Sequence, residues 1–291
     1  MSDKSKILIH LDTDACPSVF DRIVAIDSGV DHLFSYSSVT PANVMPLVHG
    51  CIFTRGPKDL HRTAIFVGGS DVSAGEAVVN AFRKHMILAA RLMVSVMLDS
   101  NGANTTSVAA VRAAGQHLPL SSTTSLVLGG TGPVGQRVAR LLAKHGGTVK
   151  LGSRSKDKAE VIANVIRQQV PGAKIEAVAV SNSEDGPVAL AGCDLVIASG
   201  AAGAVLLPRK VRDTAKGLKV LIDLNGVPPA GIEGVELMDK GIVRDGVTCY
   251  GALGVGGSKM KIHRAAVAAL FESNDRVLDV EEIYALAAAI G

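Results

Sequence analysis

The chain has 291 residues, of which 47% are hydrophobic and 20% are charged, and its formal net charge is only +3. This length is enough for one large domain or two ordinary domains, each with its own core. The 30 Lys and Arg residues form no long basic block, so the composition indicates no nucleic-acid partner. Mean hydropathy is high at +0.31, yet no run of about 18 apolar residues occurs, which excludes a membrane-spanning helix.

Two further features bear on the cellular setting. The first six residues lead into an apolar segment without the hydrophobic region of a signal peptide, so we expect a cytoplasmic protein. The four cysteines stand singly, which is typical of reduced thiols rather than paired zinc ligands. They are Cys16, Cys51, Cys193 and Cys249. We therefore expect no metal site.

Short β-branched runs alternate with longer amphipathic segments along the whole chain. In chain order, this pattern predicts strands at residues 7–11, 63–67, 93–98, 125–128, 148–151, 174–178, 194–198 and 220–222. It predicts helices at residues 17–27, 42–48, 73–85, 105–116, 133–144, 156–168 and 187–190. Strands that alternate with helices indicate βαβ units and an α/β fold with parallel sheets.

A Pro/Ser/Thr-rich segment at residues 117–124 interrupts this alternation just before a strongly apolar strand. We therefore predict two α/β domains, the first at residues 1–119 and the second at residues 120–291. Residues 260–291 are predicted to form two helices separated by a short polar break. We expect this C-terminal helical tail to brace the first domain.

The sharpest local signal is a glycine-rich turn that follows the strand at residues 125–128. A strand, a G-x-G-x-x-G turn and an amphipathic helix in succession predict a dinucleotide-binding Rossmann domain. The first glycine permits the tight turn, the second lets the backbone approach the pyrophosphate, and the third lets helix and strand pack closely. The N–H groups at the helix start would then face the phosphates. The residues assigned to this turn are Gly130, Thr131, Gly132, Pro133, Val134 and Gly135. A glycine-rich turn without a ligand is the alternative.

The second strand of this domain indicates the type of cofactor. About 20 residues after the turn, NAD enzymes usually carry an Asp or Glu that binds the ribose 2′-hydroxyl. This chain instead has Ser153 and Arg154, with Lys156 and Lys158 just behind. A carboxylate would repel a 2′-phosphate, whereas Arg and Ser would bind it. NADP is therefore the predicted cofactor, with NAD bound more weakly. A solvated basic helix start is the alternative.

Two later loops are candidates for the nicotinamide half of the dinucleotide. Ser199, Gly200 and Ala201 follow the strand at residues 194–198, and their small side chains leave room for a ligand. Asn225 follows the next strand, at the same edge of the predicted sheet. Each loop is equally compatible with an ordinary tight turn.

The first half of the chain carries three polar clusters, each where a predicted strand ends and a helix begins. They lie at residues 12–21, 66–71 and 98–106. Ligands bind at such carboxyl ends of strands in open α/β sheets. Each cluster is also a good capping sequence, in which Ser18, Ser73 and Asn104 would be N-caps without a ligand role.

Five segments, read together, carry a resemblance to a known family. They are Asp12-Thr-Asp-Ala-x-Pro-Ser-Val-Phe-Asp21, Thr63-Ala-Ile-Phe-Val-Gly-Gly69, Met97-Leu-Asp-Ser-Asn-Gly-x-Asn-Thr-Thr106, Gly130-Thr-Gly-Pro-Val-Gly135 and Gly251-Ala-Leu-Gly-Val-Gly-Gly257. Through them the chain resembles the NADP-dependent methylene-tetrahydromethanopterin dehydrogenases of methylotrophic bacteria. The resemblance covers essentially the whole chain.

This resemblance implies two α/β domains around a deep cleft in a cytoplasmic homo-oligomer. It implies oxidation of a methylene-tetrahydropterin to the methenyl form, with hydride transfer to NADP, in one-carbon (formaldehyde) metabolism. By matching motifs, the pterin is expected near Ser18, Phe20, Asn101 and Thr105, with Asp21, Asp99 and Lys259 as candidate catalytic groups. Ser258 stands where the family more often has Leu, and the choice between tetrahydromethanopterin and tetrahydrofolate stays open.

The proposed chemistry fits the lack of a recognisable triad or ligand cluster. Hydride transfer releases no proton, so the protein needs mainly to align the reactants and exclude water. Asp21 or Asp99 could stabilise the developing cation or bind the amino-pyrimidine edge, and Lys259 could pair with a substrate oxygen or be solvated. His10 is interpreted as a core or surface residue, and His263 as facing the cofactor phosphates or solvent.

Three other functions fit the same residues. Two are enzymes, a methylene-tetrahydrofolate dehydrogenase/cyclohydrolase and a reductase of the shikimate dehydrogenase type. The third is an NADP-sensing protein that performs no reaction.

Overall fold

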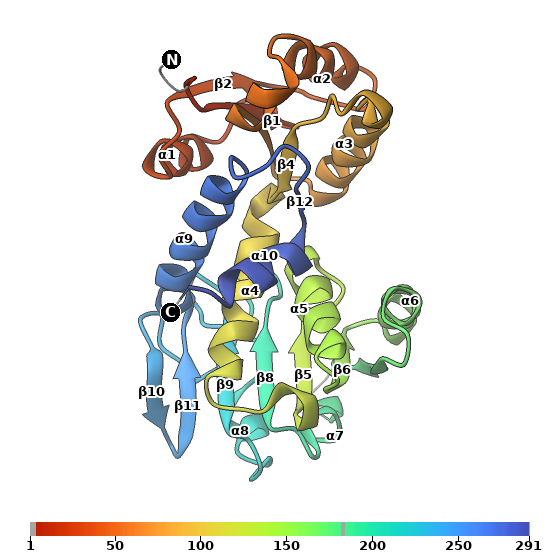
Figure 1. Ribbon diagram of the computed structural model, residues 1–291. Helices are drawn as coiled ribbons and strands as arrows, with labels where there is room; N and C mark the ends of the chain where they lie inside the picture. Colours follow the sequence, from red (N-terminus) through yellow and green to blue (C-terminus); the bar gives the residue numbers. More distant parts are fainter. Residues whose placement is uncertain (1–3, 182–183, 291) are drawn as a thin grey trace. The chain divides into compact units, whose positions relative to one another are not determined.

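The structure is a computed structural model that describes residues 4–181 and 184–290. The chain divides into two compact units, Met1–Thr105 with Met260–Gly291, and Thr106–Lys259. Each unit has its own sheet with helices packed against it (Figure 1), so the α/β fold is confirmed. The division at residue 105 lies inside helix α4 (Ala103–Gly115), whereas the sequence placed the boundary after residue 119. The cleft implied by the resemblance stays a prediction.

The first unit contains a five-stranded parallel sheet in the order β12-β4-β3-β1-β2. Its strands are β1 (Ile7–Asp12), β2 (His32–Tyr36), β3 (Thr63–Gly68), β4 (Ser95–Leu98) and β12 (Val277–Leu278). The sequence did not predict β2 or β12. The edge strand β2 is exposed at alternate residues, and β12 has only two residues, so neither forms an apolar run.

The helices of this unit each bury apolar side chains. They are α1 (Val19–Asp27), α2 (Val44–Phe53), α3 (Val72–Lys84) and α10 (Val280–Ala287), with 3₁₀ turns at Pro57–Arg62, Leu88–Ala90 and Ser100–Gly102. Phe82 of α3 packs fully buried with Ile65 of β3 and Ile52 of α2. Burial of such a side chain contributes about 1.5–3 kcal/mol. The core of this unit thereby fixes the carboxyl ends of β1, β3 and β4.

Capping differs in part from the sequence interpretation. Ser18 is the N-cap of α1 as predicted, because its hydroxyl accepts the Asp21 N–H at 3.2 Å. Asp71 rather than Ser73 caps α3, since its carboxylate accepts the Ser73 N–H at 2.8 Å. Asn104 lies inside α4, where its amide donates to the carbonyl of Leu98 at 2.6 Å and is not a cap.

The second unit contains a seven-stranded sheet in the order β10-β11-β9-β8-β5-β6-β7. Its strands are β5 (Thr124–Leu128), β6 (Thr148–Ser153), β7 (Lys174–Ala179), β8 (Leu195–Ala198), β9 (Val220–Asp223), β10 (Lys240–Arg244) and β11 (Val247–Tyr250). Only β10 is antiparallel to its neighbour. Numbered along the chain from β5, with the antiparallel edge strand β10 left out, the six parallel strands run in the order 3-2-1-4-5-6. This is the order of a dinucleotide-binding Rossmann sheet.

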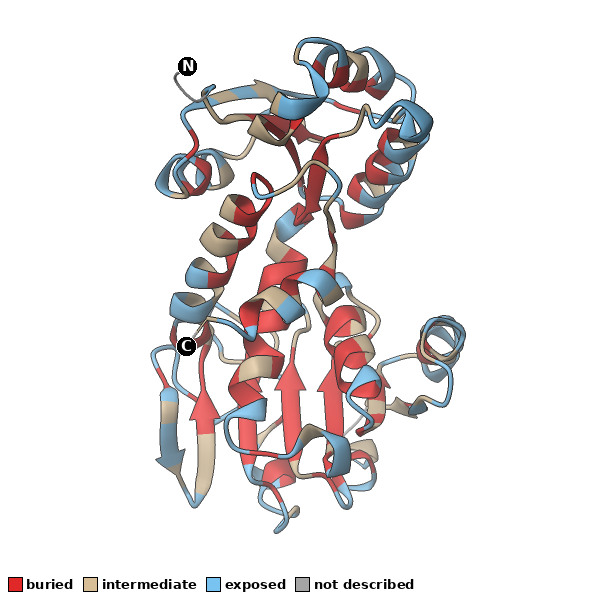
Figure 2. Cartoon of the chain, viewed as in Figure 1, coloured by how far each residue is buried: buried red, intermediate tan, exposed pale blue. Residues whose placement is uncertain are grey.

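The helices of the second unit accompany a sheet whose strands β8 and β9 are fully buried, whereas β7 and β10 have exposed residues (Figure 2). They are α5 (Pro133–Lys144), α6 (Lys156–Gln169), α7 (Asp185–Leu190) and the short α8 (Arg209–Arg212), with a 3₁₀ turn at Leu120–Ser122. The hairpin β10–β11 and helix α8 were not predicted, because each of these elements is only four or five residues long.

The C-terminal tail also differs from its prediction. Helix α9 (Ala252–Ala269) begins before residue 260, and strand β12, which pairs with β4, lies between the predicted break at Asn274-Asp275 and α10. None of the helices in the described ranges has the length and hydropathy needed to cross a bilayer.

Candidate functional site

The glycine-rich turn between β5 and α5 has the geometry of a nucleotide-binding turn. A Cβ on Gly135 would lie 2.5 Å from the carbonyl oxygen of Gly129, so only glycine lets α5 approach the turn. A Cβ on Gly130 would lie 2.5 Å from Leu151 Cδ1. Gly132 differs, because its Cβ would meet Gly129 O at an ordinary 3.4 Å. Packing within the protein therefore does not require glycine at 132, and its bare backbone suits a ligand.

Helix α5 begins just after the carboxyl end of β5. Gly132 is its N-cap and Pro133 its first residue, where a missing N–H is harmless. The first N–H groups of a helix have no acceptor within the helix and carry its positive dipole end. The turn therefore offers donors and positive potential to a phosphate.

Basic side chains follow the end of β6. Ser153 is partly buried, and its hydroxyl accepts the Ser155 N–H at 3.3 Å. Arg154, Lys156 and Lys158 are exposed at the start of α6. Within the part of the chain that the structure describes, the Arg154 guanidinium has neither a hydrogen bond nor an ion pair. The cation is thus available to an anionic ligand.

The loop after β8 packs directly on the glycine-rich turn. The Ser199 N–H and hydroxyl both donate to the Leu128 carbonyl, at 2.9 and 3.1 Å. A Cβ on Gly129 would lie 2.5 Å from Gly200 Cα. Ala201 is exposed beyond this contact. The structure therefore brings Ser199 and Gly200 to the turn, with the Ser199 hydroxyl already used inside the protein.

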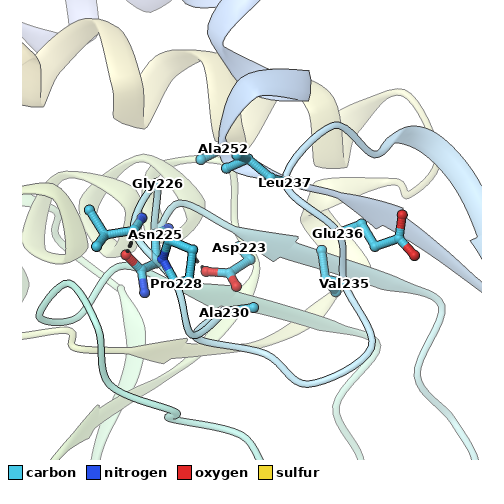
Figure 3. A pocket seen from close by; sticks show the side chains of 11 residues that line it. Asp223, Asn225, Gly226, Pro228, Ala230, Val235, Glu236, Leu237 and Ala252 are labelled. Carbon is cyan, nitrogen blue, oxygen red and sulfur yellow. Dashed lines mark hydrogen bonds between the residues drawn. The ribbon is translucent and has the colours of Figure 1, made fainter.

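A pocket of about 150 Å³ lies where β9 and β11 end (Figure 3). Its lining comes from the loop after β9 and from the start of α9, and includes Asn225, Val227, Pro228, Leu237 and Ala252. The sequence assigned Asn225 to the site and quoted the segment that begins at Gly251, but it gave no role to Val235, Glu236 and Leu237, because their approach depends on the tertiary fold.

Two polar residues, Asp223 and Asn225, hold the loop that lines this pocket. Asp223 is buried and accepts the N–H groups of Asn225 at 3.0 Å and Ile232 at 2.9 Å. Burial raises its pKa, although the backbone N–H groups oppose this shift. The Asn225 amide donates to the Pro229 carbonyl at 2.9 Å and accepts the Val227 N–H at 3.0 Å. Both side chains therefore hold the loop in shape.

In the first unit, Asp99 and Thr105 are buried against each other. Asp99 is 1% exposed, and its carboxylate accepts the Thr105 N–H at 3.0 Å and the Thr105 hydroxyl at 2.6 Å. This pair ties the end of β4 to the first turns of α4. Neither side chain is presented to solvent.

Other residues of the same edge are exposed. Phe20 is 49% exposed and Asp21 partly so, both in the first turn of α1. Asn101 is exposed in the left-handed conformation with φ 54°, and its N–H donates to the Gly69 carbonyl at 2.7 Å. The Ser100 hydroxyl donates to the Gly68 carbonyl at 3.0 Å, which fixes this loop to β3. Phe20, Asp21 and Asn101 therefore lie at least partly at the surface of this sheet edge.

Lys259 and His263 lie in α9, in the second and the first unit respectively. Lys259 is partly buried. His263 is only 1% exposed, its ring stacks on Phe66 with centroids 5.5 Å apart, and its Nδ1 lies 3.8 Å from Asp99 Oδ2. The interpretation of His263 as a solvent-facing residue is wrong, because α9 buries this position in the first unit.

The cysteines and carboxylates form no metal cluster in the described ranges. No group of three or more His, Cys, Asp or Glu there could hold a metal ion. The four cysteines are free thiols, and three are buried. Burial raises the pKa of Cys51 to about 12 and those of Cys193 and Cys249 to about 11.

Comparison with known proteins gives matches over the whole chain. The model of the N-terminal region of methylene-tetrahydromethanopterin dehydrogenase matches residues 19–101. The bifunctional protein MdtA of Methylorubrum extorquens is 45% identical over 288 residues, which cover 97% of this chain and 98% of that protein. An NAD(P)-dependent methylenetetrahydromethanopterin dehydrogenase of the same organism is 29% identical over 283 residues, 94% of each chain.

One solved structure shows the same arrangement of elements. Shikimate 5-dehydrogenase from Listeria monocytogenes, in complex with shikimate and NAD, aligns with a TM-score of 0.59. The alignment covers 97% of this chain and 96% of that chain at 12% sequence identity. This similarity concerns the fold alone.

Proposed function

Because the chain belongs to the methylene-tetrahydromethanopterin dehydrogenase family, we propose that it oxidises methylene-tetrahydromethanopterin to the methenyl cation with NADP as hydride acceptor. The observation that carries this proposal is the second unit. It combines the Rossmann strand order, a turn whose Gly132 is not required by packing, and an exposed Arg154 whose guanidinium has no partner among the residues that the structure describes. The alternatives of a sensor or another reductase lack an equally specific observation.

The residues around the second sheet fit a dinucleotide along the carboxyl ends of its strands. We assign the 2′-phosphate to Arg154, with Ser153, Lys156 and Lys158 beside it, and the pyrophosphate to the turn at Gly132. NAD lacks the 2′-phosphate and is expected to bind more weakly. The nicotinamide is assigned to the pocket at Asn225, on the far side of β5 from β6.

The pterin is assigned to the first unit. Phe20 offers an exposed ring for stacking, and Asp21 and Asn101 offer exposed polar groups at the same sheet edge. Ser18 supports this surface by capping α1. We assign Asp99 and Thr105 a structural role there, because each already binds the other. Lys259 is assigned to a substrate oxygen.

The reaction requires little from the protein beyond alignment and electrostatics. The methylene C–H bond breaks with both electrons leaving as hydride, and the resulting charge spreads over two nitrogens. When bound, NADP supplies the acceptor for that hydride. No proton leaves, so no general base is needed. We assign the stabilisation of the cation to Asp21, because its carboxylate is partly exposed whereas that of Asp99 is buried.

We also propose that the protein is a cytoplasmic homo-oligomer of one-carbon metabolism. The family resemblance implies this setting, and exposed apolar side chains such as Ile23 and Phe34 are compatible with subunit contacts. Sedimentation of the purified protein tests the oligomeric state.

A spectrophotometric assay tests the activity. Purified protein is given methylene-tetrahydromethanopterin or methylene-tetrahydrofolate, each with NAD or NADP, in buffer containing chelator. We expect NADPH absorbance to rise with a methylene-pterin. The absence of turnover in all four combinations, with NADP still bound, would favour the sensor. Loss of activity on chelation would contradict a metal-free mechanism.

A further inference from the structure

Asp12 is a buried carboxylate that the proposed reaction does not use. It ends β1 and is fully buried. Its Oδ1 accepts the Asp14 N–H at 2.8 Å, and its Oδ2 accepts the Ser18 N–H at 2.9 Å. His10 is a core residue, 1% exposed, whose Nε2 lies 3.3 Å from Asp12 Oδ2 without a hydrogen bond to it. Because a buried charge costs free energy unless it is hydrogen-bonded, the two backbone N–H groups are fixed around Asp12.

These hydrogen bonds lead from Asp12 to Asp21. Ser18, whose N–H donates to Asp12, is also the N-cap of α1. Its hydroxyl accepts the Asp21 N–H at 3.2 Å. A path of two hydrogen bonds therefore connects the buried carboxylate to the backbone of Asp21 in the first turn of α1.

Two neighbouring loops hold the same segment in place. From the loop after β2, the Val39 N–H donates to the Asp12 carbonyl at 2.9 Å and the Ser38 N–H to the Asp14 carbonyl at 2.8 Å. From the loop after β3, Ser70 donates its N–H and its hydroxyl to the Asp14 carboxylate, both at 2.9 Å. The segment between β1 and α1 thus has a defined conformation before a ligand binds, which lowers the cost of ordering it.

The Asp21 carboxylate lies over the end of the strand next to Asp12. Gly68, the last residue of β3, is paired in register with Asp12 of β1. A Cβ on Gly68 would lie 3.4 Å from Asp21 Oδ2. The position of this carboxylate on the sheet edge therefore depends on where α1 begins, and Ser18 sets that point.

We propose that Asp12 is a positioning residue for Asp21. It fixes Ser18, and Ser18 fixes the first turn of α1, so that the Asp21 carboxylate is in place over the end of β3 before the substrate binds. A charge that is already oriented stabilises a transition state without the cost of reorganisation. The role of Asp21 in the reaction rests on the proposed function, whereas the hydrogen bonds of Asp12 do not.

A double-mutant cycle of Asp12→Asn and Asp21→Asn tests this coupling. An Asn at 12 keeps one acceptor oxygen but turns its amide N–H groups toward the second backbone N–H. The measurements are the single-turnover rate of hydride transfer, Kd for NADP, and deuterium uptake of the peptide covering residues 13–22. Asp31→Asn is the matched control, because the Asp31 carboxylate accepts the Lys6 N–H at 2.7 Å at the opposite end of β1.

We expect Asp12→Asn to lower the single-turnover rate about tenfold, equivalent to about 1.4 kcal/mol, and to raise deuterium uptake at residues 13–22. Its Kd for NADP should stay within about twofold of wild type. In the Asp21→Asn background the same substitution should lower the rate less than about twofold, because two residues that act as one unit are not additive. Asp31→Asn should match wild type in all three measurements. If Asp12→Asn does not fold, Ser18→Ala replaces it in the cycle, since it removes only the hydroxyl that accepts the Asp21 N–H.

Equal losses of rate in both backgrounds would overturn the proposal, since Asp12 would then act independently of Asp21. Unchanged deuterium uptake in Asp12→Asn would also overturn it, as would a wild-type rate in Asp21→Asn. A wild type that oxidises neither methylene-pterin would contradict the proposed function instead, and deuterium uptake would then decide alone whether Asp12 fixes the first turn of α1.

Discussion

The Asp99 carboxylate binds Thr105 twice, through the backbone N–H at 3.0 Å and the hydroxyl at 2.6 Å. An Asn at 99 would keep both contacts, because its oxygen can accept the N–H and its amide can donate to the hydroxyl. We therefore expect Asp99→Asn to retain turnover. Asp99→Ala should lower the free energy of unfolding by about 1.5–3 kcal/mol, the range for hydrogen bonds to a charged group. Urea unfolding and steady-state kinetics measure both effects.

A different result would give Asp99 a catalytic role. If Asp99→Asn abolished turnover while stability and pterin affinity stayed at wild type, the negative charge itself would act on the cation. Thr105→Val is the control, since it removes the hydroxyl contact and leaves the charge at 99.

Asp21 should show the opposite behaviour. Its carboxylate is partly exposed in the first turn of α1. A negative charge beside a developing cation lowers the barrier, so Asp21→Asn should lower kcat by about tenfold or more, or about 1.4 kcal/mol. The melting temperature should stay nearly unchanged. Single-turnover rates measure this effect, and an unaltered rate with a raised KM would make Asp21 a binding residue only.

How far the sequence predicted this structure depends on how local each signal was. The turn at Gly130 was predictable because strand, glycines and helix are adjacent in the chain. Strand β12 was not, because two residues gain their structure only by pairing with β4. The fold class was predictable because strand-like and helix-like patterns of hydrophobic residues alternate along the whole chain.

The side-chain roles were less predictable than the elements. An aspartate at a strand end can face a ligand or turn back to a helix, and the sequence at Asp99 is compatible with both. The contact with Thr105 is visible only in the structure. The burial of His263 likewise depends on the packing of α9 against Phe66.

Gly132 and Gly135 should separate ligand binding from folding. A methyl group at 135 would press on the Gly129 carbonyl, so Gly135→Ala should destabilise the second unit. The same group at 132 meets only an ordinary contact. Gly132→Ala should therefore keep the wild-type melting temperature but weaken NADP binding about tenfold or more, which is about 1.4 kcal/mol. Thermal unfolding and nucleotide titration are compared, and unaltered NADP affinity in Gly132→Ala would move the pyrophosphate away from this turn.

Arg154 should distinguish NADP from NAD. A hydrogen bond to a charged group contributes about 1.5–3 kcal/mol, so Arg154→Ala should weaken NADP binding roughly ten- to a hundredfold. NAD affinity should change less than about threefold. Ser153, Lys156 and Lys158 can share the phosphate, which favours the lower end. Lys210→Ala, an exposed cation of α8, is the control. Equal weakening of both nucleotides would assign Arg154 to the fold or the adenine.

The lowered pKa of His10 predicts how stability depends on pH. The unfolded chain protonates this imidazole as pH falls through roughly 6.5, whereas the folded chain, in which burial lowers the pKa, does so only at lower pH. The unfolded state then binds more protons, so the free energy of unfolding must fall on acidification, by at most about 1.4 kcal/mol per pH unit. The Asp12 carboxylate opposes this shift and the Arg22 guanidinium reinforces it. His145, whose pKa burial also lowers, contributes in the same direction.

Only the difference in pH dependence between the wild type and His10→Gln isolates the contribution of His10. Urea unfolding between about pH 7.5 and about pH 5 should give a steeper loss of stability for the wild type. Parallel curves would mean that His10 takes up its proton equally in both states.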